Sequence, residues 1–130
     1  MIIINNIKKY LSSIYSFFNE LDLNCKFLSL LGIVLFFAIS ISIFNTNANS
    51  TDNLSTIRTS FSSIVGYFLQ KASSKKKTIL LGMLAIFIML VILFSYIFDT
   101  PVNNPSLILF KNLFFSLMGY LTSAINKSNK

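Results

Sequence analysis

Two long uncharged segments, 27–44 and 78–98, dominate the hydropathy of this sequence. At about 1.5 Å of helical rise per residue, the shorter one spans about 27 Å, which is close to the hydrocarbon thickness of a bilayer. Each segment follows a lysine, carries a Leu-Leu-Gly tripeptide near its start and closes on a similar tetrapeptide, IFNT or IFDT. We predict that both segments are transmembrane helices.

Two further segments, 54–72 and 106–125, carry apolar and polar residues in separate stripes. Apolar residues recur at i, i+3, i+4 and i+7, and this spacing predicts a helix with two faces. Small residues and hydroxyl groups drive the association of helices in lipid. We therefore expect the polar stripe to face the inside of a bundle and the apolar stripe, for example Phe61 and Phe68, to face lipid or a neighbouring subunit. The predicted helix-packing stripe consists of Thr59, Ser63, Gly66, Asn112, Ser116, Gly119 and Ser123.

The order of these segments indicates an internal repeat of about 50 residues. An apolar helix, a polar loop and a two-faced helix follow one another in 26–72 and again in 77–126. Residues 1–25 hold a half unit, LSSIYSFF, and no stretch there is long enough to cross a bilayer. We expect this region to form an amphipathic helix in the membrane interface; the alternative is a helix packed on a partner protein.

The lysines indicate how often the chain crosses the membrane. If four helices cross, the lysines of the loops and termini all lie on one side, and neither loop on the other side has a Lys or Arg. If only 27–44 and 78–98 cross, Lys26 and the Lys75–Lys77 cluster lie on opposite sides, so we favour four crossings. Arg58 and Lys111 then lie close enough to the far interface to snorkel. The residues assigned to topology or to lipid headgroups are Arg58, Lys71, Lys75, Lys76, Lys77 and Lys111.

Composition restricts the chemistry. Of the 130 residues, 54% are hydrophobic and only 12% are charged, which is far from a soluble norm of about 25% charged. The chain has no histidine and one cysteine, Cys25, so His-based metal sites, His-based triads and an internal disulfide are excluded. The acidic residues fall in interfaces or loops, which argues against a coupled transporter. We expect no enzyme activity, no cofactor and no nucleic-acid partner.

The sequence therefore predicts an all-α integral membrane protein with an N-terminal amphipathic helix and two tandem transmembrane hairpins. We expect a structural subunit of a larger assembly, in an organellar membrane or a membrane-containing virion. Its lysine-rich side would face the cytoplasm, matrix or virion interior. The expected partners are the lipid bilayer, anionic lipids and other membrane protein subunits. The alternatives are a curvature-shaping protein, whose hairpin arrangement resembles that of reticulon-type proteins, and a small homo-oligomeric pore of holin or channel type.

Overall fold

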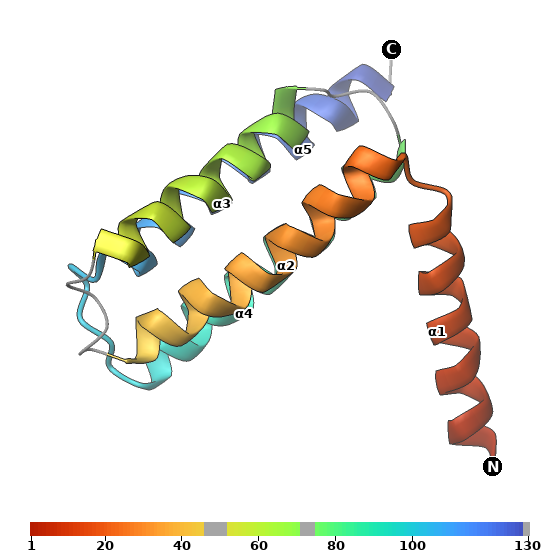
Figure 1. Ribbon diagram of the computed structural model, residues 1–130, viewed down its shortest axis with the longest axis horizontal. Helices are drawn as coiled ribbons and strands as arrows, with labels where there is room; N and C mark the ends of the chain where they lie inside the picture. Colours follow the sequence, from red (N-terminus) through yellow and green to blue (C-terminus); the bar gives the residue numbers. More distant parts are fainter. Residues whose placement is uncertain (46–51, 71–74, 129–130) are drawn as a thin grey trace. The chain divides into compact units, whose positions relative to one another are not determined.

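The computed structural model describes residues 1–45, 52–70 and 75–128, and within these ranges the chain is helical with no strand. This confirms the predicted all-α class. The chain divides into two compact units, Met1–Leu31 and Gly32–Lys130. Figure 1 shows the helices in chain order: α1 (Ile2–Asn19), α2 (Leu23–Phe44), α3 (Asp52–Gln70), α4 (Lys75–Ile97) and α5 (Pro105–Ser128).

Three of these helices are long and apolar enough to cross a membrane: α2, α4 and residues Pro105–Lys127 of α5. The two apolar segments predicted from the sequence are among them. The helix α3 is not, because Ser, Thr, Asn and Arg side chains interrupt its apolar residues. By length and composition the chain is thus compatible with a membrane protein.

In the unit Gly32–Lys130, consecutive helices run in opposite directions (Figure 1). Near one end, the ring of Phe44, the last residue of α2, lies 5.9 Å from the ring of Phe98, which directly follows α4 (distance between centroids). Near the other end, the Thr78 and Tyr120 hydroxyl oxygens, close to the start of α4 and the end of α5, are 3.5 Å apart.

Phenylalanine rings from α2, α3 and α5 meet in the core of this unit, and a fourth ring, Phe87 of α4, lies at its edge with 51% exposure. The rings of Phe36 in α2 and Phe110 in α5 are stacked, with 5.3 Å between centroids and 12° between planes. Phe61 of α3 lies 6.0 Å from Phe110, and Phe87 of α4 lies 6.4 Å from Phe36. Phe61 and Phe110 are fully buried, at 1% and 0% exposure. Aromatic contacts therefore join α2, α3 and α5 here, whereas α4 contributes Leu81, Ala85, Ile88 and Ser95 to the buried core.

The turn between α4 and α5 is fixed by residues that stop one helix and start the next. Asp99 adopts a left-handed conformation with φ 50°, and the amide of Thr100 donates to the carbonyl of Ser95 at 3.0 Å. This pattern is a Schellman-type helix end, in which glycine usually occupies the left-handed position. Pro105 then occupies the first position of α5, where its missing N–H is not needed.

Candidate interaction surfaces

The exposed side of α3 is polar along its length. Among residues 53–70, whose side chains the structure describes, the exposed ones are Asn, Ser, Thr or Gln, and the buried ones are Leu, Phe, Ile or Val. Two hydroxyls donate hydrogen bonds to backbone carbonyls of their own helix: Thr59 to the carbonyl of Ser55 at 3.0 Å and Ser63 to the carbonyl of Thr59 at 2.9 Å. We call this surface the α3 polar face; its exposed residues are Asn53, Ser55, Thr56, Thr59, Ser60, Ser63 and Gln70.

This orientation is the reverse of the one expected from the sequence. Phe61, Ile64, Val65 and Phe68, expected to face lipid or another subunit, are buried in the core. Thr59 and Ser63, expected inside the bundle, are exposed, and Gly66 is half-buried. The physical reason is that four converging helices leave a central space that large aromatic side chains fill, whereas hydroxyls bonded to their own backbone need no partner inside.

The polar stripe of α5 is also exposed. Asn112, Ser116, Gly119 and Ser123 all lie on the outer surface, and Ser116 donates to the carbonyl of Asn112 at 3.1 Å. Between them α5 also exposes apolar side chains such as Phe115, so its outer surface is mixed. The structure thus does not bring the two predicted stripes together inside one chain.

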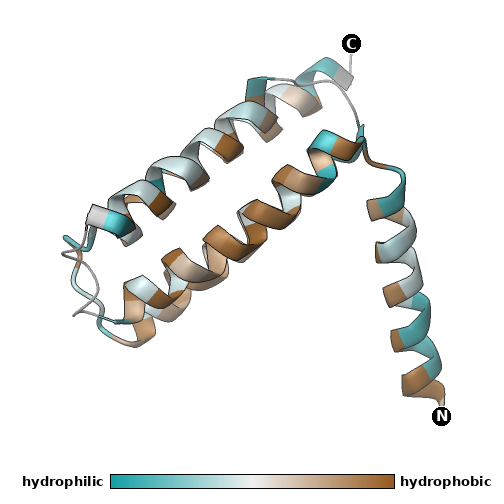
Figure 2. Ribbon diagram, viewed as in Figure 1, coloured by the Kyte–Doolittle hydropathy of each residue, from teal (hydrophilic) through white to brown (hydrophobic). Residues whose placement is uncertain are grey.

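The other outer surfaces of this unit are strongly apolar. Helix α2 is brown along most of its length in Figure 2, and the parts of α4 visible behind it are tan, whereas α3 is mostly pale or teal. Exposed side chains on α4 include Ile86, Leu93 and Phe94, and on α2 they include Phe37 and Ile41. No large hydrophobic side chain of α3 is exposed among its described residues. The outer surface therefore changes from apolar to polar between neighbouring helices.

Open space surrounds the glycines of the two stripes. A Cβ atom added at Gly66 or Gly119 would have no heavy atom of another element within 4 Å, and the same holds for Gly82 on α4. At Gly32 of α2, in contrast, an added Cβ would lie 3.6 Å from the Ile64 side chain of α3. A Cβ atom at Gly66 or Gly119 would therefore meet no other helix of the chain.

Basic residues gather at one end of the unit. The Lys75–Lys77 cluster begins α4 and Lys127 lies in the last turn of α5, and these helix ends are neighbours because α4 and α5 are antiparallel. Lys71 lies outside the described residues. Arg58 is partly buried on α3, and its Nε donates to the Leu54 carbonyl at 3.3 Å, toward the helix start and away from the lysine end. Lys111, also predicted from the sequence, is half-buried on α5.

At the opposite end, a buried polar cluster ties α2 to α5. The hydroxyls of Ser42 and Ser106 lie 2.8 Å apart, and the side-chain amide of Asn104 donates to the Ile43 carbonyl at 3.1 Å. Asn104 also caps α5, since its Oδ1 accepts from the amide of Ser106 at 3.0 Å and of Leu107 at 3.4 Å. Sequence reasoning missed this cluster. An Asn directly before Pro105 is the signal that could have found the cap, but nothing in the sequence pairs Ser42 with Ser106.

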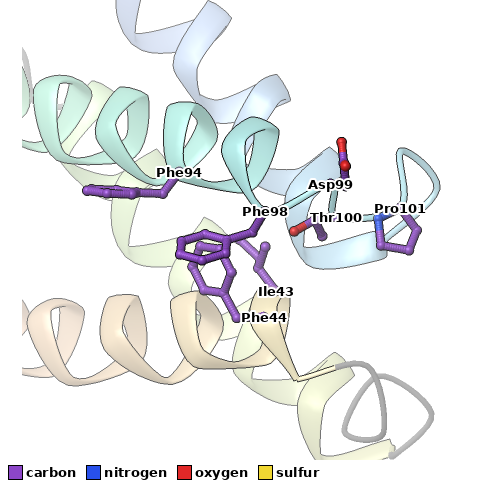
Figure 3. A pocket seen from close by; sticks show the side chains of 7 residues that line it. All are labelled: Ile43, Phe44, Phe94, Phe98, Asp99, Thr100 and Pro101. Atoms are coloured by element: carbon purple, nitrogen blue, oxygen red, sulfur yellow. The ribbon is translucent and has the colours of Figure 1, made fainter.

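Next to this cluster, a recess of about 470 Å³ lies between the ends of α2 and α4 (Figure 3). Phe44, Phe94 and Phe98 contribute three aromatic rings to its wall, and the carboxylate of Asp99 points away from the rings. Among the described residues there is no group of three or more His, Cys, Asp or Glu side chains that could hold a metal ion. The recess offers apolar contact, but no pair of side chains arranged for acid–base or nucleophilic chemistry.

The fold and these surfaces define a helical chain with three helices long and apolar enough to span a membrane, one polar-faced helix that contacts α2 and α5, and an N-terminal helix with no buried residue. Comparison with protein-family models, with curated proteins and with solved structures finds no match for this chain. Any functional conclusion therefore depends on the residues and their arrangement.

Proposed function

We propose that this chain is a non-catalytic structural subunit of a larger membrane-associated assembly, held there through the α3 polar face. The observation that carries the proposal is the contrast between neighbouring helices. Hydrocarbon suits the Phe, Ile and Leu side chains that α2 and α4 expose, whereas α3 exposes hydroxyl and amide groups. A second protein surface can pack closely against the small side chains of such a face, which lipid tails do less well.

The proposal includes four crossings. The 19 residues of α3 span about 28 Å, enough to follow a transmembrane helix through the hydrocarbon. Its contact with α5 through Phe61 and Phe110 supports this, because α5 is a candidate span. The lysines at one end of the unit also support it, since positive residues mark the cytoplasmic side of membrane proteins. That side would be the cytoplasm, matrix or virion interior.

Single cysteines in a Cys25→Ser background test the crossings. Four crossings place Ser50→Cys and Asn103→Cys on one side of the membrane and Ser74→Cys on the other; Ser50 and Ser74 lie outside the described residues. Two crossings, by α2 and α4 alone, would place Ser50 and Ser74 together and Asn103 opposite. Labelling with a membrane-impermeant thiol reagent in sealed vesicles of known orientation distinguishes the two topologies.

Substituting the stripe glycines tests the assembly. Gly66→Val and Gly119→Val add bulk where the chain itself has open space, so the chain should fold as before. A partner helix could no longer approach closely, so the complex in mild-detergent extracts should become smaller on native gels. Gly82→Val is the matched control, because it adds the same bulk in open space on the apolar helix α4. Complexes of unchanged size with both stripe variants would contradict the proposal.

A small homo-oligomeric pore is a second candidate, because the same hydroxyl-bearing face could line water if several copies surround it. The pore predicts that proteoliposomes release a trapped dye and that Ser63→Cys reacts with small thiol reagents inside the membrane. A packing interface predicts retained dye and a protected Ser63→Cys. Dye release that rises with protein density would favour the pore over the structural subunit.

A further inference from the structure

The helix α1 separates apolar and polar side chains almost completely around its axis. At 100° per residue, one side holds Ile3, Ile4, Ile7, Leu11, Ile14 and Phe18, with Tyr10 and Tyr15 near its two edges. The opposite side holds Asn5, Lys9, Ser12, Ser13 and Ser16. Tyrosines at such edges keep their rings in an apolar layer while their hydroxyls reach water.

Within its own unit, Met1–Leu31, the apolar side of α1 is not covered by other residues. No residue of α1 is buried, and Ile7 and Leu11 are 52% and 60% exposed. The chain itself indicates what covers this side. Helix α1 ends at Asn19 and α2, a candidate membrane span, begins at Leu23. A linker this short holds α1 at the surface of the bilayer that α2 enters, so the occupant is lipid.

The polar side of α1 indicates which property of the lipid matters. It is mostly Ser and Asn, and its charges are Lys8 and Lys9, with no acidic residue inside the helix. Near an anionic leaflet, one lysine contributes about as much to binding as the burial of one methylene group. The apolar side buries many such groups. Its insertion therefore depends on gaps between headgroups more than on surface charge.

We propose that α1 is a lipid-packing sensor, which inserts its apolar side into loosely packed or strongly curved bilayers and leaves tightly packed, flat ones. The two lysines favour phosphate-rich surfaces without deciding the selectivity. This inference does not depend on the α3 polar face, because it concerns α1 and the lipid beside it.

The test uses the full chain with Cys25→Ser and Ile14→Cys, labelled with an environment-sensitive fluorophore and reconstituted into vesicles. Small sonicated and large extruded vesicles of the same phosphatidylcholine vary packing. Large vesicles with increasing phosphatidylserine vary charge. We expect a blue shift of the emission in small vesicles and a much smaller change on adding phosphatidylserine.

Three variants sharpen the test. Ile7→Ser, on the apolar side, should abolish the blue shift. Ile2→Ser is the matched control, because Ile2 is 79% exposed but lies on the polar side, and it should keep the shift. Lys8→Gln with Lys9→Gln should also keep it. A probe that stays in water in every vesicle, or one whose shift follows phosphatidylserine and not curvature, would overturn the proposal. Neither result would affect the α3 experiments.

Discussion

Asn104 is the residue whose loss should most clearly loosen the end of the bundle. It is 4% exposed, caps α5 through its Oδ1 and reaches the Ile43 carbonyl through its Nδ2. Removing an N-cap costs about 1 kcal/mol, and leaving a buried acceptor without its donor costs about 1–3 kcal/mol. The Ile43 carbonyl lies in the last turn of α2, and the helix has no amide four residues further on that could replace the lost donor. Asn104→Ala should therefore destabilise the chain by about 2–4 kcal/mol.

Asn104→Ser separates the two contributions. Serine keeps an oxygen that can cap α5, but its side chain is too short to reach the Ile43 carbonyl. It should lose only the tie between helices, so its destabilisation should be about 1 kcal/mol smaller than that of Asn104→Ala. Reversible unfolding of the purified chain in mixed micelles, followed by circular dichroism, measures both. An Asn104→Ala variant within about 0.5 kcal/mol of the parent chain would refute the reasoning, since that is the range of neutral surface changes.

Three further predictions use the same unfolding assay. Phe110→Ala should destabilise the chain by about 3–5 kcal/mol because it removes the ring at the centre of the aromatic core. Phe115→Ala, at a position with 72% exposure, should change stability by less than about 0.5 kcal/mol. Equal effects of the two substitutions would contradict the placement of Phe110 in the core. A double-mutant cycle of Ser42→Ala and Ser106→Ala should give a coupling of about 0.6–1.5 kcal/mol from the 2.8 Å hydroxyl contact, and strictly additive effects would contradict it. Asp99→Gly should stabilise the chain by up to about 1 kcal/mol because glycine readily adopts a φ of 50°, and Asp99→Val should destabilise it by about 1–2 kcal/mol. A valine variant more stable than the glycine variant would exclude a left-handed helix end.

Local signals in the sequence predicted the elements well. Uncharged runs of membrane-spanning length predicted α2 and α4, because length and hydropathy suffice to recognise such a helix. Pro101 and Pro105 mark the turn between α4 and α5, since proline cannot continue one helix but can begin the next. These signals lie within a few residues of one another, so no knowledge of the distant chain is required.

The orientation of the two-faced helices could not be obtained in the same way. A period of 3.6 residues places Phe61 and Ser63 on different faces of the helix, but it does not determine which face packs against the rest of the protein. The choice depends on whether the helix has protein, lipid or water beside it. For α3 the deciding contacts are with Phe36 and Phe110, which lie on helices distant in sequence.

The sequence by itself thus determined the helices, their order, and the stripes along each of them, because these depend on local spacing and composition. Only the tertiary structure decided that the phenylalanine stripe of α3 fills the core and the hydroxyl stripe lies outside. It also joined Ser42 to Ser106 and Asn104 to Ile43, contacts that exist only once four helices lie side by side. The physical reason is that burial is a property of the whole packed unit, whereas a helical period is a property of one segment.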